Sequence, residues 1–184
     1  THLAEDTLKM DYSSKLDWVM NWIEEHPLKK CVIFSQYEGP LALLRERIRK
    51  LKEVKAGYQT WAYLSSNKTI GDKKFDDVFD IVTAFNMDKR VRWLLGTLGA
   101  GGEALNLQED CSDVILLDLW WNKPAMDQAE KRVDRNGQKD EVNVWMVYAA
   151  DTIEQDIQEM IDAKDDIASV TTDTRKLLMI HARL

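Results

Sequence analysis

The chain has 184 residues and a formal net charge of −7, with 45% hydrophobic and 31% charged residues. This composition is typical of a globular domain with a substantial core rather than of a disordered or membrane chain. No apolar run approaches the roughly 20 residues of a transmembrane helix, and the negative charge argues against a broadly basic surface that coats nucleic acid. The chain opens on Thr1 rather than methionine, so we expect a fragment of a longer protein.

The first part of the chain predicts two helices around a buried strand. Residues 1–13 show no clear pattern and are expected to be a lead-in segment. Ser14 is expected to cap a helix that ends at Pro27. Residues 31–35 (CVIFS) form an apolar run rich in β-forming residues, which predicts a buried strand. A second helix is expected over 39–52, with apolar residues at helical spacing facing inward, namely Leu41, Leu44, Ile48 and Leu51.

The rest of the chain alternates further strands with helices. Strands are expected at 61–65, 91–97, 114–118 and 142–148. Helices are expected up to about Phe85, over the arginine-bearing stretch 128–136, at 152–168 and at about 173–184. Strands that alternate with helices predict an α/β fold with a mainly parallel sheet and helices on both faces, because parallel strands need long crossovers.

Polar residues and glycines gather where the predicted strands end. Ser35 and Gln36 follow one strand, a glycine-rich loop follows Thr97, and Asp118 begins a stretch that reaches Asn122. Right-handed crossovers bring the carboxyl ends of parallel strands to one edge of the sheet, where ligands bind in open α/β folds. The sequence therefore predicts a functional site at this edge.

One predicted helix carries two arginines and a glutamine on a single stripe. Gln128, Arg132 and Arg135 are spaced by four and three residues, so they share a helix face, and Gly137 permits the helix to end. Two guanidinium forks less than a turn apart can clamp a polyanion such as a phosphate chain. The alternative is a solvated helix with intrahelical ion pairs.

The glycine loop at 96–107 (GTLGAGGEALNL) could bring backbone N–H groups close to an anion. It contains no lysine and has no G-K-[ST] sequence, so it is not a Walker A loop, and a plain tight turn is the alternative. Because the chain shows neither a phosphate-binding lysine loop nor a strand-end acidic pair for Mg²⁺, the main cradle of any nucleotide must lie elsewhere.

The charged runs and the cysteines have simpler interpretations. Residues 45–55 hold six basic side chains against two acids, and residues 151–166 hold seven acids against Lys164. Each run alone is typical of a solvated helix face, and a partner surface is the alternative. Cys31 and Cys111 lie in or beside apolar runs and are expected to be buried thiols, and no Cys/His set has zinc spacing. We therefore expect an intracellular protein.

The motifs together resemble the second RecA-like lobe of superfamily 2 helicases, specifically the Swi/Snf-type ATPases that translocate on double-stranded DNA. The resemblance covers about residues 14–160, and its most specific part is Q-A-x-x-R-x-x-R-x-G-Q at 128–138. The other motifs that carry it are KCVIFSQ (30–36), TLGAGGEALNL (97–107), LLDLWWN (116–122) and VYAADTIEQDI (147–157).

The resemblance implies a role for each matching residue. Arg132 and Arg135 would be arginine fingers that reach the γ-phosphate of ATP across a cleft between two lobes, and Gln128 would set their helix against the nucleotide. Asn106 would lie near the nucleotide, and Trp121 and Asn122 would couple the DNA groove to the ATP cleft. The residues implied in contacts to the DNA backbone are Ser35, Gln36, Thr97, Gly101 and Gly102.

The resemblance also implies a domain organisation, cofactors and partners. Residues 14–168 would form a three-layer RecA-like lobe of the P-loop NTPase type, followed by a C-terminal helical extension at 169–184. ATP and Mg²⁺ would be held mainly by an N-terminal lobe that this chain lacks, so the isolated lobe is expected to be inactive. The partners would be that lobe and the backbone of double-stranded DNA, without a membrane. The protein would act in the cytoplasm or nucleoid of a bacterial or viral system, or in a eukaryotic nucleus.

The chain departs from the family pattern at several positions. Ala104 stands where glycine is usual, Lys123 interrupts the common W-N-P, and residues 61–75 match poorly the usual strand and D-G-S turn. Two other hypotheses therefore stay open. One is a non-catalytic module that binds nucleic acid or protein and keeps the lobe fold. The other is a Rossmann-like transferase in which Asp118 would bind a ribose.

Overall fold

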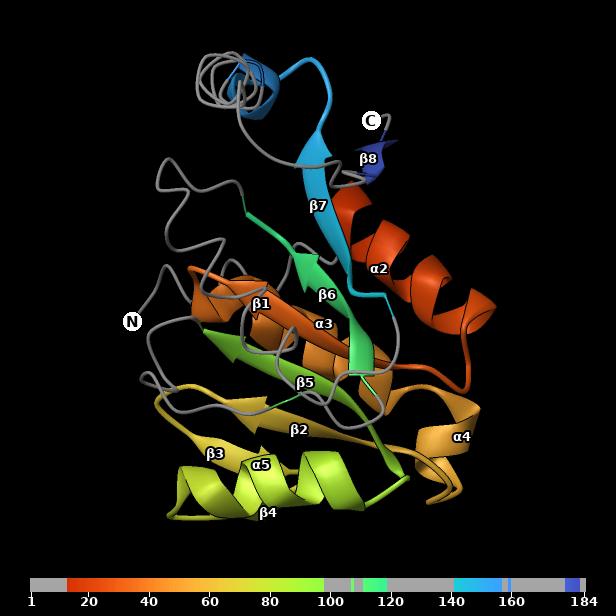
Figure 1. Cartoon of the computed structure of the whole chain (residues 1–184), viewed down its shortest axis with the longest axis vertical. Helices are drawn as coiled ribbons and strands as arrows, with labels where there is room; N and C mark the ends of the chain where they lie inside the picture. The colour runs from red at the N-terminus through yellow and green to blue at the C-terminus, as the bar shows by residue number, and fades with distance from the viewer. Residues whose placement is uncertain are drawn as a thin grey trace.

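One sheet organises the structure, which is a computed structural model that describes residues 13–97, 107, 111–118, 141–156, 159 and 178–182. Eight strands of these residues lie in the order β4-β3-β2-β5-β1-β6-β7-β8 (Figure 1). All neighbours from β2 to β8 are parallel, whereas β3 and β4 are antiparallel additions at one end. In chain order the strands are β1 (Lys30–Ser35), β2 (Thr60–Leu64), β3 (Lys68–Ile70), β4 (Lys73–Lys74), β5 (Val91–Thr97), β6 (Cys111–Leu116), β7 (Asn143–Ala149) and β8 (Leu178–Ala182).

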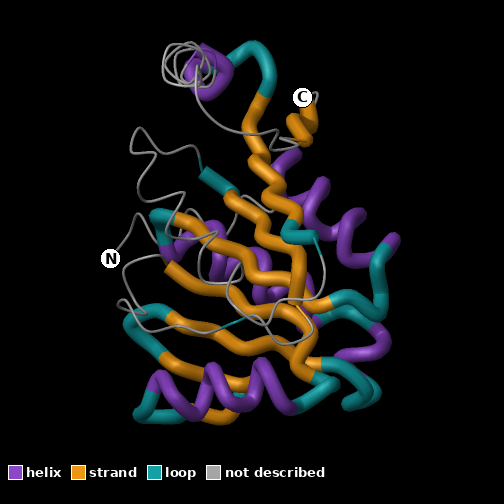
Figure 2. The backbone as a smooth tube through the Cα atoms, viewed as in Figure 1, coloured by secondary structure: helices purple, strands orange, loops and turns teal. Residues whose placement is uncertain are grey.

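Helices cover both faces of this sheet, as the alternating pattern predicts (Figures 1 and 2). The described helices are α2 (Ser14–Glu25), α3 (Glu38–Arg49), α4 (Lys52–Lys55) and α5 (Val78–Met87). Leu41 of α3 joins Ile33 of β1 in the core on one face, together with residues of α2. Phe85 of α5 joins Val32 and Phe34 in the core on the other face. The mainly parallel three-layer α/β architecture is therefore confirmed.

The alternation of side chains along β1 explains why one strand serves two cores. Successive residues of a strand point to opposite faces, and all six residues of β1 are buried. β1 lies between β5 and β6, so its backbone groups are satisfied on both sides. A continuous apolar run at 31–35 is the sequence pattern that such a doubly covered strand requires.

Local signals place the helix ends close to their predicted positions. The first helix is capped by Ser13, whose side chain accepts a hydrogen bond from the backbone N–H of Leu16, so the cap lies one residue before the predicted Ser14. The helix ends at Glu25, and its C-cap residue His26 lies directly before Pro27. Asp77 caps α5 by accepting from the N–H of Phe79 at 2.9 Å. The buried residues of α5 are Ile81 and Phe85, whereas Phe79 in its first turn is exposed.

The polar stretch around Gly71 forms a hairpin that the sequence pattern did not predict. β3 runs antiparallel to β2, and β4 runs antiparallel to β3. Gly71 has a φ of 55°, the left-handed conformation that a tight turn between short strands uses and that glycine adopts at little cost. Strands of three and two residues are too short to show a hydrophobic period, which is why the prediction failed there.

The C-terminal part also differs from its prediction. Residues 178–182 form β8, which pairs in parallel with β7, so the expected helix is wrong at these positions. The backbone gives the physical reason: without β8, one side of β7 would be an open edge with unpaired N–H and C=O groups. Tertiary pairing therefore overrides the helical pattern at these positions. Within the described residues, no helix is both long and apolar enough to cross a bilayer.

Both cysteines are buried thiols, as predicted. Neither forms a disulfide. Burial raises the pKa of Cys31 well above its ordinary value and raises the pKa of Cys111 to about 12. Both thiols therefore stay protonated, and chemically inert, at neutral pH.

We expect an uncharged thiol reagent at pH 8 to label both cysteines only when the protein unfolds, because the native thiols are buried and protonated. Time-resolved labelling followed by mass spectrometry, with and without urea, measures this. Since folding raises the pKa of Cys111, its contribution to stability is complete below the unfolded value of 9.0 and is lost as the pH rises toward about 12. Equal labelling rates in native and unfolded protein would contradict this assignment.

Candidate functional site

The carboxyl ends of four parallel strands lie level with one another at one edge of the sheet. Ser35 pairs with Thr97, and Phe34 pairs with both Gly96 and Leu116. Leu64 of β2 also pairs with Gly96, so β2 ends at the same level. The sequence prediction that these strand ends meet is confirmed. We call this region, formed by the last residues of β2, β5, β1 and β6 and the first residues after them, the carboxyl edge.

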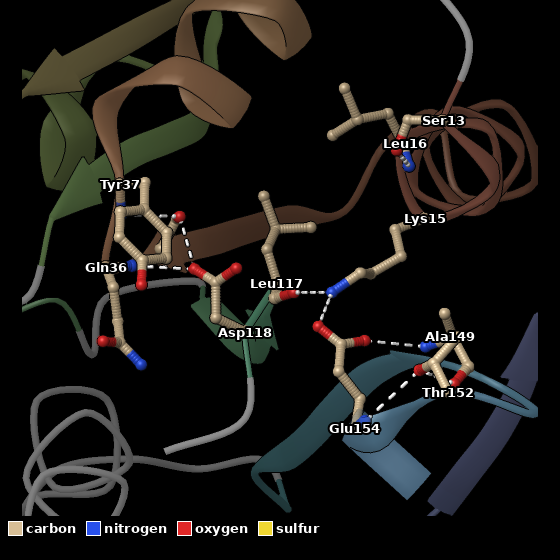
Figure 3. A network of polar contacts seen from close by, with 11 residues as sticks. Ser13, Lys15, Leu16, Gln36, Tyr37, Leu117, Asp118, Ala149, Thr152 and Glu154 are labelled. Atoms are coloured by element: carbon tan, nitrogen blue, oxygen red, sulfur yellow. Dashed lines mark hydrogen bonds and ion pairs between the residues drawn. The ribbon is translucent and has the colours of Figure 1, made fainter.

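A single carboxylate holds the loop that leaves β1. The hydroxyl of Ser35 donates to Oδ2 of Asp118 at 2.5 Å. The backbone N–H of Gln36 donates to the same oxygen at 2.8 Å (Figure 3). The N–H of Tyr37 in turn donates to the Ser35 hydroxyl at 3.0 Å. Asp118 thus fixes the turn between β1 and α3 through two hydrogen bonds to an ionisable group, which are stronger than neutral ones.

This arrangement separates the roles of Ser35 and Gln36. Ser35 is fully buried, its only hydroxyl proton points at Asp118, and it accepts from Tyr37. The Ser35 side chain therefore serves as an internal support, and the structure does not present it to a ligand. Gln36 and Tyr37 are exposed at the edge, with 63% of Tyr37 accessible, and Thr97 beside them is half-buried.

A glutamate also orders the end of β2. Glu38, in the first turn of α3, accepts a hydrogen bond from the backbone N–H of Ser66 at 3.1 Å. This bond and those from the Ser66 and Ser65 side chains lower the pKa of Glu38, so the carboxylate is ionised at neutral pH. The loop after β2 is therefore tied to the same helix that follows Ser35 and Gln36.

Lys15 ties three segments together near the end of β6. Its ammonium group donates to the carbonyl of Leu117 at 3.0 Å and to a carboxylate oxygen of Glu154 at 2.5 Å. The other oxygen of Glu154 accepts from the N–H of Ala149 at 2.8 Å, directly at the end of β7 (Figure 3). Leu117 is held from the α2 side and Asp118 from the β1 side, so two independent contacts fix the chain where it leaves β6.

Several predicted site residues lie outside the described residues. They comprise the implied arginine fingers and their glutamine, the implied nucleotide and coupling residues, and two implied DNA contacts: Arg132, Arg135, Gln128, Asn106, Trp121, Asn122, Gly101 and Gly102. Among the described residues, no group of three or more His, Cys, Asp or Glu side chains could hold a metal ion. The described part of the site is therefore the edge formed around Gln36, Thr97 and Asp118.

The structure also shows site residues whose roles the sequence interpretation missed. Lys15 and Glu154 are 139 positions apart, and no local pattern connects them. The sequence places Asp118 at a strand end, where the transferase hypothesis makes it a ribose ligand. Its Oδ2 is instead occupied by Ser35 and Gln36, which disfavours that hypothesis. A buried strand that ends in serine, with an acid at the end of the neighbouring strand, is the signal that could have suggested this pairing.

The three arginines of the basic run at 45–55 pair with acids of the same chain. Arg47 pairs with Asp17 at 2.5 Å. Arg45 pairs with Glu46 at 3.2 Å, and Arg49 pairs with Glu46 and with Asp72. Its arginines thus bind acids of the same chain, which supports the interpretation as a solvated helix face.

We expect Asp118→Ala to destabilise the fold by about 2–3 kcal/mol, because it leaves the buried Ser35 hydroxyl and the Gln36 N–H without their acceptor. Asp118→Asn keeps an acceptor oxygen and should cost about 1 kcal/mol. Urea unfolding curves of the two variants measure these differences. Asp72→Asn serves as the matched control, since this carboxylate pairs with exposed Arg49. A urea unfolding midpoint of Asp118→Ala equal to that of wild type would contradict the role of Asp118 in holding the turn between β1 and α3.

The Lys15–Glu154 pair is testable by a double-mutant cycle. Its side chains are only 20% and 26% exposed, so we expect a coupling free energy of about 1 kcal/mol, at the upper end for surface pairs. The variants are Lys15→Met, Glu154→Gln and the double variant, compared by urea unfolding. Additive effects of the two single changes would show that the pair contributes nothing to stability.

Comparison with known proteins identifies the family. The model of the helicase conserved C-terminal domain matches residues 14–137, about two-thirds of the chain. A solved structure, the C-terminal part of the Fun30 ATPase domain, superposes with a TM-score of 0.63 at 25% identity. The match covers 79% of this chain and 44% of that chain.

Two curated relatives agree with this match. Transcription termination factor 2 of Drosophila melanogaster is 36% identical over 160 residues, which are 85% of this chain and 14% of the relative. A putative SWI/SNF-related regulator of chromatin of Arabidopsis thaliana, subfamily A member 3-like 1, is 31% identical over 170 residues, 90% of this chain and 18% of the relative. The chain thus spans less than a fifth of the length of either relative. The chain belongs to the helicase conserved C-terminal domain family, as a C-terminal RecA-like lobe of the Swi/Snf type within superfamily 2.

Proposed function

We propose that the chain is the second motor lobe of an ATP-dependent translocase on double-stranded DNA. It contacts the DNA phosphate backbone through the carboxyl edge and supplies Arg132 and Arg135 to ATP held by an N-terminal lobe. Family membership supports the motor assignment, since the matched region includes the Q-A-x-x-R-x-x-R-x-G-Q motif at 128–138 except its last residue, Gln138. The proposal rests mainly on one observation: this arginine motif occurs in a chain whose parallel strands end side by side at the carboxyl edge.

Gln36 and Thr97 are the described side chains best placed to contact DNA. Both follow or end neighbouring strands, and Ser35 next to Gln36 is fixed by Asp118. Because this backbone is already held in place, little further conformational entropy is lost when its neighbouring polar groups bind a phosphate. Contacts of this kind go to the sugar–phosphate backbone and position a protein without reading sequence. Gly101 and Gly102 extend the proposed contact in the loop after β5.

Arg132 and Arg135 act across the interlobe cleft. Their guanidinium groups stay charged and can form two hydrogen bonds each to phosphate oxygens. Bound ATP, with Mg²⁺, supplies the phosphoryl group whose transfer to water drives the cycle. The arginines stabilise the negative charge that develops on that group, and Gln128 orients their helix. Asn106 lies on the nucleotide side of the glycine loop in this proposal.

Trp121 and Asn122 couple the two activities. They follow directly from the segment that Lys15 and Asp118 hold at the end of β6. Because the chain is held at Leu117 and Asp118, a movement of Trp121 and Asn122 on nucleotide binding would be passed to the DNA-contacting loops through only a few residues. Closing and reopening of the interlobe cleft would then move the lobe along the duplex.

We expect Arg132→Ala and Arg135→Ala, each made in the whole protein, to lower DNA-stimulated ATP hydrolysis by roughly 10³–10⁵-fold. Duplex binding and the thermal melting temperature should be retained, because these side chains act on the nucleotide rather than on the fold. A coupled ATPase assay with saturating duplex measures the decrease. Arg90→Ala is the matched control, since Arg90 is exposed and pairs with Asp88 at the opposite end of the sheet. Wild-type turnover in both finger variants would overturn the proposal.

A further inference from the structure

Three hydrogen bonds connect the carboxyl ends of β6 and β7, which are parallel neighbours in the sheet (Figure 3). The ammonium group of Lys15 donates to the carbonyl of Leu117, the residue that follows β6, at 3.0 Å. It also donates to Oε1 of Glu154 at 2.5 Å. Oε2 of Glu154 accepts from the N–H of Ala149, the last residue of β7, at 2.8 Å. Side chains from α2 and from the segment after β7 therefore join two neighbouring strand ends.

The position of Lys15 is unfavourable for its own helix. Lys15 is the second residue of α2, where the helix dipole favours an acid rather than a cation. Its side chain is nevertheless only 20% exposed, and its two acceptors lie 102 and 139 positions away in the sequence. A residue that breaks a local preference in this way is expected to serve the tertiary structure or the function.

Leu117 begins the stretch of chain that carries the arginine motif. This stretch connects β6 to β7, and its sequence includes the motif at 128–138. Leu117 is buried, its N–H donates to the carbonyl of Phe34 at 2.9 Å, and its carbonyl accepts from Lys15. The backbone is therefore held through both of its polar groups at the point where the stretch leaves the sheet.

The contact made by Lys15 is separate from the contact between Ser35 and Asp118. Asp118 is held from β1, whereas Leu117 is held from α2. A substitution of Lys15 removes the second contact and leaves the first in place. The effect of Lys15 on activity can therefore be measured while the turn between β1 and α3 stays fixed.

We propose that Lys15 and Glu154 position the arginine-bearing stretch for ATP hydrolysis. The inference rests on the proposed function, in which Arg132 and Arg135 stabilise charge on the transferring phosphoryl group. Lys15 and Glu154 are positioning residues: they fix the backbone from which the stretch starts and touch neither nucleotide nor DNA. Positioning matters because a misplacement of about 1 Å can cost about 100-fold in rate. A contact that served stability alone would leave turnover by the folded protein unchanged when it is removed.

The test is ATP hydrolysis by the whole protein with saturating duplex, at a temperature well below melting. We expect Lys15→Met to lower kcat roughly 10- to 100-fold while KM for ATP and Kd for duplex stay within about twofold, because the arginines act on charge that develops in the transition state. Lys15→Arg keeps a charged donor and should recover most of the turnover. Glu154→Gln, which keeps the shape of its side chain, should lower kcat in the same way and carries the test should Lys15→Met unfold.

A double variant and a matched control separate positioning from stability. Lys15→Met/Glu154→Gln should lower kcat no more than Lys15→Met alone, because the two side chains act through one contact. Asp17→Asn breaks a different ion pair of α2, with Arg47 of α3. It should lower the urea unfolding midpoint and leave kcat unchanged.

The outcomes distinguish this inference from the proposed function. Wild-type kcat in Lys15→Met, while Arg132→Ala stays inactive, would overturn the positioning role and leave the proposed function standing. A raised KM or Kd with unchanged kcat would also contradict it, since such a change reports lost ground-state binding. An equal loss of kcat in Asp17→Asn would assign the effect to reduced stability instead. Wild-type turnover in both Arg132→Ala and Arg135→Ala would overturn the proposed function itself.

Discussion

The structure depends on a single parallel strand that is buried along its whole length. β1 lies in the middle of the sheet, and its side chains alternate between the two cores. Only its ends carry polar side chains. At the amino end, the buried ammonium group of Lys30 donates to the carbonyls of Phe85 and Asn86, at the negative end of the α5 helix dipole. At the carboxyl end, Ser35 donates to Asp118. Each end of the strand is thus anchored by a polar contact to a different element.

This anchoring links the core to the site. A buried hydroxyl needs a partner, and Asp118 provides it while also accepting from the N–H of Gln36. The hydrogen bond between Ser35 and Asp118 therefore also fixes the backbone of the next residues, Gln36 and Tyr37, which are exposed. Lys15 adds a second restraint at the neighbouring carbonyl of Leu117. The backbone of the carboxyl edge is thus held by polar contacts where β1 and β6 end.

Many charged side chains of the described structure pair with one another and so support the fold. The arginines of α3 bind acids from α2, α3 and the hairpin turn, so they join elements to one another. Asp113 is another internal support: it is buried, accepts from the indole N–H of Trp145 at 3.0 Å and pairs with Lys29 at 3.1 Å. The lysines of the β3–β4 hairpin have no such partners among the described acids.

The sequence by itself determined the alternation of strands and helices, the buried strand at 31–35, the buried cysteines and the family. Each of these features can be predicted from local sequence patterns, namely the hydrophobic period, the capping residues and the spacing of motifs. Only the tertiary structure decided that Ser35 is an internal support, that Lys15 meets Glu154, that residues 178–182 pair with β7 and that a short hairpin extends the sheet beyond β2. These features join residues far apart in the chain or strands too short to show a period. They are fixed by which backbone edges and buried polar groups must find partners once the sheet has formed, and no local stretch of sequence contains that information.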